Sequence, residues 1–575
     1  MKSSLTFLSC ALFLLHLNAC TSRKISEKDS IPADSVSIAA GQIIFSQNCG
    51  ACHNFKEDGI GPSLGGLTKK VSPDWIKAFI KDAKAIIESG DDRAQGLLEK
   101  YHTVMPSFAS YSEEELNSIL AYLDTKKLAD PRKQWLDPKA LKNPIPEPIP
   151  MSDLVVDLEL FTQIPPSGET NPLTRITKIE VQPKTKELFI VDLRGKLYHL
   201  KGSQPEIYMD MGKLKPHFIH KPGLATGFGS FAFHPEFAKN GLLYTTHTES
   251  PGSGKADFDY PDSIKVTLQW VLSEWKTNQP GGIPFSGESR ELFRVNMMSP
   301  IHGVQEITFN PISVKGDEDY GLLYIGIGDG GSAENGYQFL CHSTEKIWGT
   351  VLRIDPRGNN APNGHYGIPA GNPFLNSGNP KVLTEIFAYG FRNPHRITWS
   401  RAGQLLVSNV GHHNVESLYI IKPGSDCGWP IREGSFVIDP SQNMRNIYRL
   451  PPDDKKYHIN YPVAQYDHDE GDAIAGGLEY WGSGLPKLKG KFLFGDIVRG
   501  RLFYVEMKDL KAGGAAQIKE WRVSINGSIK TLKDLCGVDK VDERFGRDSE
   551  GELYITTKPD GKVYKMVGSR LVLHQ

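Results

Sequence analysis

Cys49, Cys52 and His53 form a C-x-x-C-H motif, the arrangement with the most specific chemistry in this chain of 575 residues. In such a motif the two thiols attach covalently to a haem, and the histidine becomes an iron ligand. The alternatives are a redox-active thiol pair and half of a zinc site. No second cysteine pair follows at zinc spacing, and no alternating strand–helix pattern surrounds the motif. The motif therefore predicts one covalently bound haem c.

A second iron ligand must come from elsewhere in the chain, and Met105 in the segment VMPSF is the candidate. Pro106 disfavours a helical conformation at Met105, so this segment is expected to extend across a haem face. A methionine ligand raises the reduction potential of a haem relative to a second histidine. His102 is the competing candidate. We expect His53 and Met105 to bind the iron.

Helices are expected to position these ligands. Residues 73–87 form a helical stretch between them, and Ser112 is a predicted N-cap followed by acidic residues in the first turn. Residues 36–128 as a whole resemble a class I cytochrome c, which is an all-α domain. The resemblance implies that the loop GIGPSLGG passes beneath His53 and that the Pro62 carbonyl accepts a hydrogen bond from its imidazole.

Residues 1–20 have the pattern of an export signal, because a positive start precedes an apolar run that is too short to cross a bilayer. The run ends in Leu-Asn-Ala-Cys, which resembles the lipobox of bacterial lipoproteins and makes Cys20 the predicted lipidation site. Simple cleavage after Ala19 is the alternative. The polar residues 21–35 are expected to be a flexible tether. We therefore predict an exported, periplasmic protein that is held to the cell envelope membrane by a lipid anchor only.

The overall composition limits the partners of this chain. The formal net charge is −1, which gives no electrostatic reason to expect nucleic acid. The 57 Gly and 38 Pro residues indicate a turn-rich chain and favour β structure over a helical bundle. Three cysteines remain outside the signal and the haem motif, namely Cys341, Cys427 and Cys536. They allow either one disulfide with one free thiol or three buried thiols.

Residues 129–157 are predicted to link two domains, because residues 143–150 read NPIPEPIP and favour a semi-rigid polyproline spacer. From 158 to 567 the chain repeats a β-type run, a Gly or Pro turn and another β-type run. Six such units occur, the first at residues 178–200 and the last at 544–566. None can bury its strands alone, and such repetition is typical of a radial array of sheets. It predicts a six-bladed β-propeller, whereas a β-sandwich would need fewer and more evenly spaced strands.

Several motifs of this large domain occur in a characteristic order. They are GSFAFHPEF, GTVLRIDP, IPAGNPF, EIFAYGFRNPHRITW, CGWPIREG and GKFLFGDIVRGRLF. The series resembles the glucose/sorbosone dehydrogenase family, whose members include soluble quinoprotein glucose dehydrogenase and aldose sugar dehydrogenases. The resemblance implies a six-bladed propeller that carries pyrroloquinoline quinone (PQQ) and calcium over its channel. The implied reaction oxidises the C1 hydroxyl of an aldose to a lactone.

The same resemblance implies catalytic roles for three residues. His302 corresponds to the base that removes the hydroxyl proton, a role that suits a neutral imidazole near neutral pH. Arg392 and Asn393 correspond to the pair beside the reactive oxygens of the quinone. A guanidinium suits this position because it can bind quinone oxygen or carboxylate in one plane.

Calcium sites are also implied by the resemblance. The two successive backbone carbonyls that bind the ion beside the quinone correspond to those of Gly411 and His412, where relatives usually have Gly-Pro. Glu416 corresponds to an acidic ligand of a second, structural calcium. Both assignments use hard oxygen ligands, which calcium prefers.

Some positions that anchor the quinone in this family differ here. The lysine expected before Arg-Gly in the fifth repeat is Val498, so the adjacent Arg499 and Arg501 are the predicted replacements. Further cationic candidates a few residues away from the expected positions are Arg544 and Arg547. Several cations are needed because PQQ carries three carboxylates. The acidic residue expected before the base is Ile301, which removes one partner that could orient His302.

Three functions are compatible with these observations. The first is a PQQ-dependent sugar dehydrogenase that passes electrons to its own haem and then to a downstream acceptor, a cytochrome or the respiratory chain. A tethered haem is present at high effective concentration, which explains the fusion. The second is a quinone-less propeller that binds carbohydrate or protein beside an independent cytochrome c. The third is oxidation of another alcohol class with a different cofactor.

Overall fold

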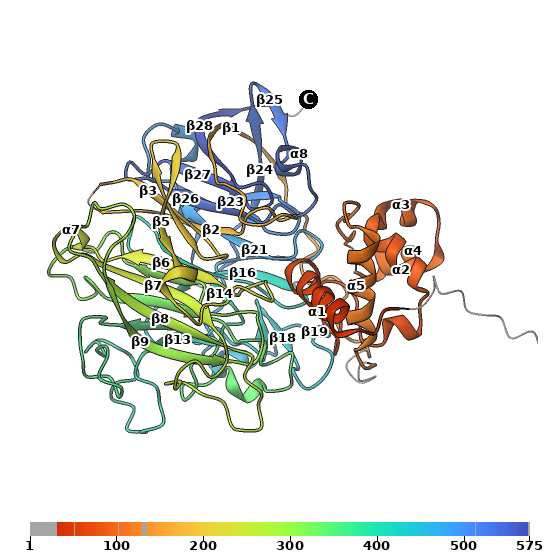
Figure 1. Ribbon diagram of the computed structural model, residues 1–575, viewed down its shortest axis with the longest axis horizontal. Coiled ribbons are helices and arrows are strands. Elements are labelled where there is room, and N and C mark those ends of the chain that lie inside the picture. The colour runs from red at the N-terminus through yellow and green to blue at the C-terminus, as the bar shows by residue number, and fades with distance from the viewer. Residues whose placement is uncertain are drawn as a thin grey trace, which may run out of the picture.

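The computed structural model describes residues 31–50, 52–101, 103–128, 135–183, 185–511 and 513–572. The predicted signal peptide, Cys20, His102 and most of the predicted tether lie outside the described residues. Within those described ranges, no helix combines the length and the apolar composition needed to cross a membrane. Figure 1 shows a smaller body of helices beside a larger body of sheets.

The smaller body contains the haem motif. Its helices are α1 (Ser35–Ile44), which continues into a π-helical turn (Phe45–Cys49), α2 (Pro73–Lys81), α3 (Ala83–Glu88), α4 (Asp92–Tyr101) and α5 (Glu113–Asp124). The helical stretch predicted over 73–87 is divided at Asp82, whose φ of −155° is not helical and whose carboxylate caps α3 at the Ala85 N–H. The N-cap predicted at Ser112 is confirmed, and it forms a capping box with Glu115.

Helices α1 and α5 cross at a close contact. Gly41 of α1 lies so near that a Cβ there would be 1.8 Å from the carbonyl oxygen of Ser118 in α5. The absence of a side chain at Gly41 therefore allows the two backbones to approach. Since α1 leads directly into Cys49, this contact also fixes the start of the haem motif relative to α5.

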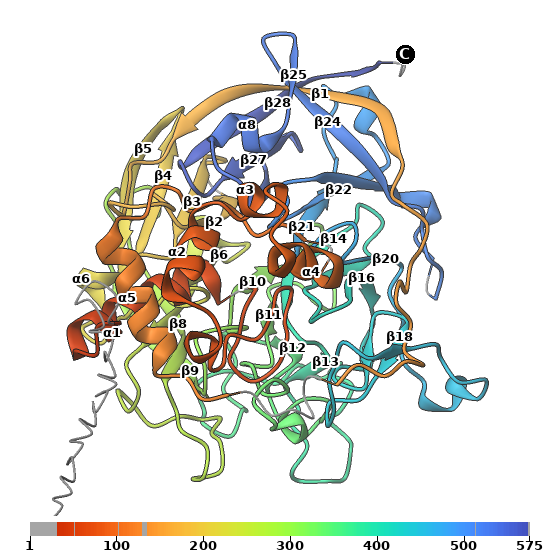
Figure 2. The same ribbon diagram turned by 90° about the vertical axis from the view of Figure 1, so that its right-hand side faces the viewer.

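The larger body consists of mainly antiparallel sheets arranged around a common centre, as Figure 2 shows. One four-stranded sheet contains β2 (Ile176–Val181), β3 (Leu188–Asp192), β4 (Lys196–Lys201) and β5 (Gln204–Asp210). The next contains β6 (Phe228–Phe233), β7 (Leu242–Glu249), β8 (Leu268–Lys276) and β9 (Glu288–Met297). The third contains β10 (Glu306–Phe309), β11 (Leu323–Ile327), β12 (Thr350–Ile354) and β13 (Ile386–Tyr389).

A fourth four-stranded sheet contains β14 (Pro394–Trp399), β15 (Leu405–Asn409), β16 (Val415–Ile421) and β20 (Ala464–Asp467). A small sheet beside it contains β17 (Arg432–Glu433), β18 (Phe436–Ile438) and β19 (Ile447–Tyr448). The remaining strands form a nine-stranded sheet: β21 (Ile474–Glu479), β22 (Lys491–Asp496), β23 (Leu502–Glu506), β24 (Lys519–Ile525), β25 (Ser528–Lys530), β26 (Glu543–Arg547), β27 (Leu553–Thr557), β28 (Lys562–Leu571) and β1 (Met151–Gln163). Each predicted repeat forms successive antiparallel strands of one sheet.

Strand β1 joins the two ends of the larger body. It begins at Met151, inside the segment that was expected to be linker, and β28 extends to Leu571, beyond the predicted end of the domain. β1 pairs antiparallel with β28 and parallel with β24. Pairing on both sides covers the edges of β24 and β28, which would otherwise expose unpaired backbone groups.

The segment predicted to be a spacer is attached to the larger body. The Leu141 N–H donates to the Ile447 carbonyl over 2.9 Å, and the Ile145 N–H donates to the Asp467 carboxylate over 3.0 Å. Leu141 and Ile145 also pack against the hydrophobic cluster around β18 and β19. The described part of this segment therefore runs along the surface of the sheets.

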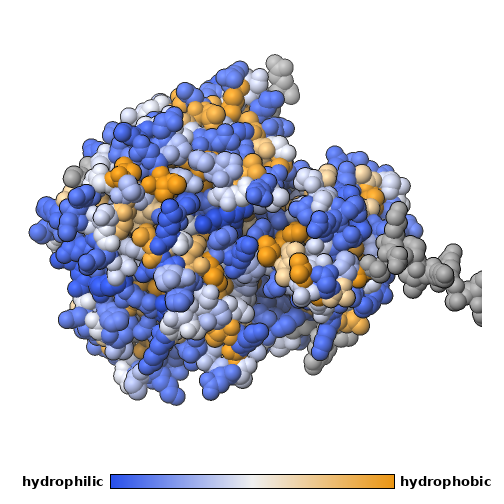
Figure 3. All heavy atoms as spheres, in the orientation of Figure 1, coloured by the Kyte–Doolittle hydropathy of each residue, from blue (hydrophilic) through white to orange (hydrophobic). Residues whose placement is uncertain are grey.

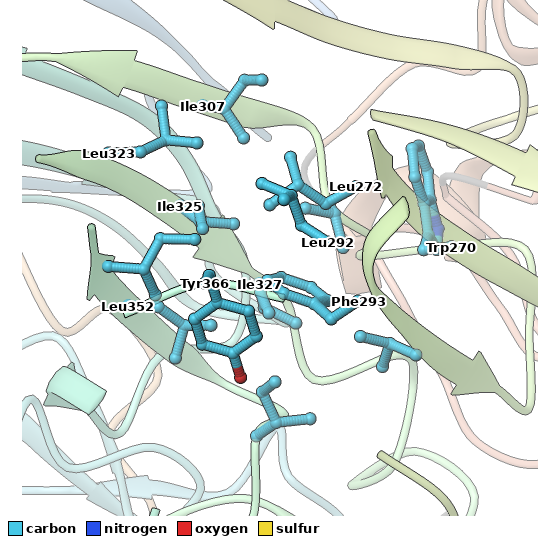
Figure 4. Close-up of a cluster of buried hydrophobic side chains, with 14 of the residues drawn as sticks. Trp270, Leu272, Leu292, Phe293, Ile307, Leu323, Ile325, Ile327, Leu352 and Tyr366 are labelled. Carbon is cyan, nitrogen blue, oxygen red and sulfur yellow. The ribbon is translucent and has the colours of Figure 1, made fainter. Parts of the chain in front are cut away.

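The sheets are held together by large hydrophobic clusters between them. Figure 4 shows one between the second and third sheets, in which Leu272 of β8 and Leu292 of β9 lie on the side of Ile325 and Ile327 of β11. On the surface seen in Figure 3, by contrast, hydrophobic residues occur only in small groups among hydrophilic ones.

Cys341 and Cys427 are buried and Cys536 is partly buried, and all three are free thiols.

Candidate active site and haem site

The predicted haem-binding residues line one cavity of the helical domain. The cavity has a volume of about 120 Å³, and its walls include Cys49, Cys52, His53 and Met105. Most other wall residues are apolar, among them the aromatic side chain of Phe79. The structure thus brings the predicted attachment cysteines together with both predicted iron ligands, and these four side chains fit a covalently attached haem.

His53 is held by the hydrogen bond that the resemblance implies. Its Nδ1 lies 2.9 Å from the Pro62 carbonyl oxygen, so Nδ1 carries the proton and Nε2 faces the iron position. Burial lowers the pKa of His53, although the Pro62 hydrogen bond opposes this shift. A neutral imidazole is the form that ligates iron.

A second cavity of about 270 Å³ lies between the helical domain and the sheets. The helical domain contributes Cys52 and His53 to its walls, and the sheets contribute His302, Arg392 and several other charged residues. In Figure 2 the helices lie in front of the centre of the sheets, where this cavity is located. We refer to it as the interdomain cavity.

His302 is oriented by a carboxylate from a distant part of the sequence. Its Nδ1 lies 2.7 Å from Oδ1 of Asp329, which is fully buried and also accepts hydrogen bonds from the Gly331 N–H and the Trp429 indole. Burial alone would raise the pKa of Asp329, but the His302 imidazole and the Arg392 guanidinium lower it. An ionised Asp329 holds the proton on Nδ1 and leaves Nε2 of His302 as the basic atom.

Sequence reasoning missed Asp329 because it follows the end of β11 and is not adjacent to His302 in the chain. Its position in the segment Gly-Asp-Gly-Gly is the signal that was available. The chain turns sharply here, since Gly330 and Gly331 both have positive φ, and His302 itself has a φ of +49°. Such backbone conformations are unusual for a non-glycine residue, and they mark the site as tightly constrained.

Arg392 and Asn393 line the same interdomain cavity as His302. Arg392 donates to the Gly411 carbonyl and, over 2.5 Å, to a carboxylate oxygen of Glu334. The backbone of Asn393 is fixed to β15 through the Asn409 side chain and the Val410 N–H. Both side chains line the interdomain cavity.

The residues expected to bind calcium lie in or next to the loop between β15 and β16. Gly411 and His412 line the interdomain cavity, and the Gly411 carbonyl accepts the hydrogen bond from Arg392. Glu416 is fully buried and accepts hydrogen bonds from the N–H groups of Gly411 and Ile474. His468 contacts the same carboxylate over 3.2 Å.

Arg499 and Arg501, the predicted replacements for the missing lysine, bind acidic side chains instead. Arg499 forms an ion pair with Asp472, and Arg501 forms ion pairs with Glu470 and Glu520. Neither arginine is among the described residues that line the interdomain cavity. This placement contradicts the prediction that they face the quinone position, because nearby acids satisfy their guanidinium groups.

Other cations line the cavity instead, and sequence reasoning missed most of them. They are Arg175, Lys540, Arg544 and Lys558, of which only Arg544 was a candidate. Burial lowers the pKa of Lys558 to about 7, although Asp542 opposes this shift. Arg547 lies outside this group and stacks on Trp481. Lys558 and Arg175 are far from the motifs in the sequence, and only the closure of the sheets brings them together.

Unsatisfied polar atoms show that this cavity fits an anionic group. The Nε atoms of Arg392 and Arg544 and both ring nitrogens of His395 are buried, and they have no hydrogen-bond partner among the described residues. All three side chains line the interdomain cavity. Burial lowers the pKa of His395 well below its usual value, so one of its ring nitrogens donates and the other accepts. Buried donors normally have partners, so a ligand with several oxygen acceptors suits the two Arg Nε–H groups and the His395 N–H. The carboxylates and quinone oxygens of PQQ meet that requirement.

Polar contacts join the helical domain to the sheets around the cavity. Arg445 donates to the carbonyls of Gly59 and Lys100 over 3.0 and 3.2 Å, and its guanidinium lies over the Tyr101 ring. Thr103 contacts Asp472, and the Ser107 N–H donates to Asp539. These contacts hold the haem side of the helical domain against the cavity mouth.

Comparison with known proteins identifies both domains. The Glucose / Sorbosone dehydrogenase family matches residues 175–565, and the Cytochrome c family matches residues 38–127. The chain therefore belongs to the glucose/sorbosone dehydrogenase family, and it carries a cytochrome c domain in front. The sequence motifs predicted both of these family assignments.

Individual relatives are distant. The HIPL1 protein of Arabidopsis thaliana is 27% identical over 387 residues, which cover 59% of this chain and 53% of that protein. Quinoprotein glucose dehydrogenase B of Acinetobacter calcoaceticus is 24% identical over 340 residues, which cover 55% of this chain and 64% of that protein. The chain thus spans between about half and two thirds of the length of these relatives. A crystal structure of glucose dehydrogenase matches with a TM-score of 0.50 and 17% identity, covering 71% of this chain and 99% of that one, which shows the fold alone.

Proposed function

We propose that this protein is a PQQ-dependent aldose dehydrogenase that passes electrons from the propeller to its own haem. The observation that supports this most is a shared wall between the two cavities. Cys52, His53 and Lys540 line both the haem cavity and the interdomain cavity. An electron that leaves the interdomain cavity would therefore reach the haem through one layer of side chains, without a diffusing carrier.

The residues of the interdomain cavity can bind and deprotonate a sugar. The Nε2 atom of His302 would accept the proton of the C1 hydroxyl, and Asp329 would stabilise the imidazolium that forms. Bound PQQ would supply the two-electron acceptor for the hydride at C1. Two-electron oxidation of a cyclic aldose at C1 gives a lactone, which is the proposed product.

The cations of the cavity would hold the quinone. Arg392 and Asn393 line the same cavity as His302, and Arg175, Arg544 and Lys558 of this cavity would bind the carboxylates. The carbonyls of Gly411 and His412 are the proposed ligands of calcium at the quinone, with Glu416 at a structural calcium. Each carbonyl oxygen has two lone pairs, so the Arg392 hydrogen bond to Gly411 leaves one for an ion.

The proposal extends to architecture and location. Four sheets have four strands each, and the nine-stranded sheet contains two further groups of four, β21–β24 and β26–β28 with β1. This arrangement supports a six-bladed propeller over about residues 151–571, preceded by an all-α cytochrome c domain. Export to the periplasm, a lipid anchor at Cys20 and a downstream cytochrome or respiratory acceptor are proposed from the sequence.

A second function is favoured by the ion pairs inside the cavity. Lys558 and Arg544 both pair with Asp542, and Arg392 pairs with Glu334. Cations that already have acidic partners have less need of an anionic cofactor. A quinone-less propeller that binds carbohydrate or protein beside an independent cytochrome is therefore the alternative.

Reconstitution distinguishes the two functions. The full chain with its covalent haem is incubated with PQQ and Ca²⁺, and a panel of aldoses is added while the ferrous haem bands are recorded. The dehydrogenase requires haem reduction that depends on both PQQ and an aldose. Failure of PQQ to bind, or a haem that stays oxidised with every aldose although dithionite reduces it, would support the alternative.

A further inference from the structure

A cluster of side chains that can bind a metal lies between the two domains, at the edge of the interdomain cavity that His412 also lines. Glu57 comes from the loop that follows His53, whereas His412 and His413 come from the loop between β15 and β16. All three residues are buried, with exposed fractions of 0% for Glu57 and 4% for each histidine. Their ligand atoms all lie within 4.8 Å of one another. Among the described residues, no other set of three His, Cys, Asp or Glu side chains brings its ligand atoms this close together.

We propose that Glu57, His412 and His413 bind one Zn²⁺ ion that joins the cytochrome loop to the propeller. Two imidazoles and one carboxylate are a common ligand set for zinc, with a fourth position left for water. Ligand atoms at about 2.0–2.1 Å from a tetrahedral ion lie about 3.3 Å apart, so small rotations of these side chains complete the site. Glu57 and His412 already approach within 3.2 Å.

The loop that carries both histidines is held in place by one carboxylate. Oε1 of Glu433 accepts hydrogen bonds from four consecutive N–H groups, over 2.6 Å from His412, 3.0 Å from His413, 2.9 Å from Asn414 and 3.1 Å from Val415. On the other side, the Glu57 N–H is fixed by the Asn54 side chain over 2.9 Å. The ligands are thus presented by two loops whose backbones are already ordered, which lowers the entropic cost of binding.

This site differs chemically from the proposed calcium sites. Calcium would take backbone carbonyl oxygens of Gly411 and His412 or the Glu416 carboxylate, whereas the new site uses side-chain nitrogens of His412 and His413. Imidazole ligands favour zinc and its neighbours among the first-row metals over calcium. The inference does not depend on the proposed sugar oxidation, because it needs only the docked position of the cytochrome domain.

Zinc would act as a clamp between the domains. The ion would connect a residue four positions after the haem ligand His53 to the loop that begins at Gly411 on the cavity wall. Binding across two domains stabilises their docked arrangement over any open one by the free energy of metal binding. Removal of the metal is therefore expected to loosen the domains without removing the haem.

Metal analysis of the full chain with its haem tests the proposal. Chelator-treated protein is dialysed against Zn²⁺, and bound zinc is measured by mass spectrometry and by X-ray absorption at the zinc edge. We expect one zinc per chain with histidine in its coordination shell. His413→Ala and Glu57→Gln should each lower zinc affinity at least about tenfold, because even indirect ligand supports change metal affinity by about 10–100-fold. The matched exposed variants His365→Ala and Glu114→Gln should bind like the unmodified chain.

A second measurement follows the clamp itself. Protease cleavage within residues 135–150 should be slower with Zn²⁺ than after chelation, and the difference should disappear in His413→Ala and Glu57→Gln. Haem absorption and circular dichroism report whether each variant folds, and Glu57→Asp replaces Glu57→Gln if the latter does not. Absence of stoichiometric zinc in the unmodified chain, equal zinc in the variants, or a zinc spectrum without histidine would each overturn the proposal.

Discussion

The haem cavity and the interdomain cavity share a wall but are built in opposite ways. Residues 45–123 of one continuous segment supply nearly the whole haem cavity, and most of them are apolar. The interdomain cavity takes its walls from residues between 47 and 559, and many are charged. A covalently attached group needs few directional contacts, because two thioether bonds already place it. A dissociable anion must instead be positioned by several fixed charges, and those come from many strands.

His53 of the haem cavity and His302 of the interdomain cavity also differ, in the kind of acceptor that each Nδ1 atom meets. The Nδ1 atom of His53 faces the neutral carbonyl of Pro62, nine residues along the chain, whereas that of His302 faces the anionic carboxylate of Asp329 in another loop. A neutral acceptor fixes the ring of a metal ligand, but an anionic acceptor also stabilises the protonated ring. The local contact therefore suits ligation, and the long-range contact suits proton transfer.

The largest effect should come from the haem cavity. Replacement of Cys49 and Cys52 by serine is expected to abolish covalent haem attachment completely, since both thioether bonds are lost. Haem staining after denaturing electrophoresis measures this. Reduction of an artificial dye by sugar in the PQQ-loaded variant should persist, and its loss would show that the two cavities depend on each other for folding.

His302→Ala should lower the rate of sugar-driven haem reduction about 10³-fold, because a positioned base contributes about 10²–10⁴-fold. Stopped-flow absorption of the ferrous haem measures the rate. Asp329→Asn should have a smaller effect in the same direction, since the base remains but its orienting charge is lost. Dithionite should reduce the haem normally in both variants, and slower reduction by dithionite would place the defect in the haem domain.

The pH dependence of quinone binding should report Lys558. Burial lowers the pKa of Lys558 to about 7, so the side chain is mostly charged below pH 7 and mostly neutral above it. An anionic ligand favours the charged form, so binding takes up a proton above pH 7. PQQ affinity should then be nearly constant below pH 7 and fall by up to about tenfold per pH unit above it. Equilibrium dialysis measures this, and Lys558→Met should remove the slope. An equal slope in that variant would assign the titration to another group.

The smallest effect should come from the contacts that dock the domains. Arg445→Ala removes two hydrogen bonds and a stacking contact with Tyr101, and it should slow haem reduction by PQQ-loaded protein only a few-fold. The exposed Arg449→Ala is the matched control. Dye-linked sugar oxidation should be unchanged in Arg445→Ala, because Arg445 is not among the described residues that line the interdomain cavity. A parallel loss of dye reduction would mean that Arg445 supports the sugar site itself.

Local sequence patterns predicted the haem domain well. The capping box at Ser112 was predictable because its partners are three residues apart, and the Pro62 hydrogen bond lies on a loop next to the haem motif. The division of the helix at Asp82 was missed because the Asp side chain competes for backbone N–H groups, a local choice that tertiary packing decides. The repeats likewise predicted which residues form strands, but not that β1 starts at Met151 to pair with β24 and β28.

The residues predicted to anchor the quinone show the limit of prediction from sequence patterns. Arg499 and Arg501 were chosen by their distance along the chain from a familiar motif, yet acids on neighbouring loops bind them. Arg175 and Lys558 have no motif around them, and they meet because the sheets close into a ring. Asp329 lies 27 positions from His302, and only the turn after β11 places its carboxylate against the imidazole.

The sequence by itself predicted the haem motif, the N-cap at Ser112, the strand repeats and the family, because each depends on neighbours within a few residues or on a motif. The tertiary structure alone decided which charges face the interdomain cavity, which acid orients His302 and how Glu57 reaches the two histidines. Those contacts depend on the packing of sheets and domains that are distant in the chain. Electrostatic recognition acts through space, so its partners are known only when the fold has set the distances between them.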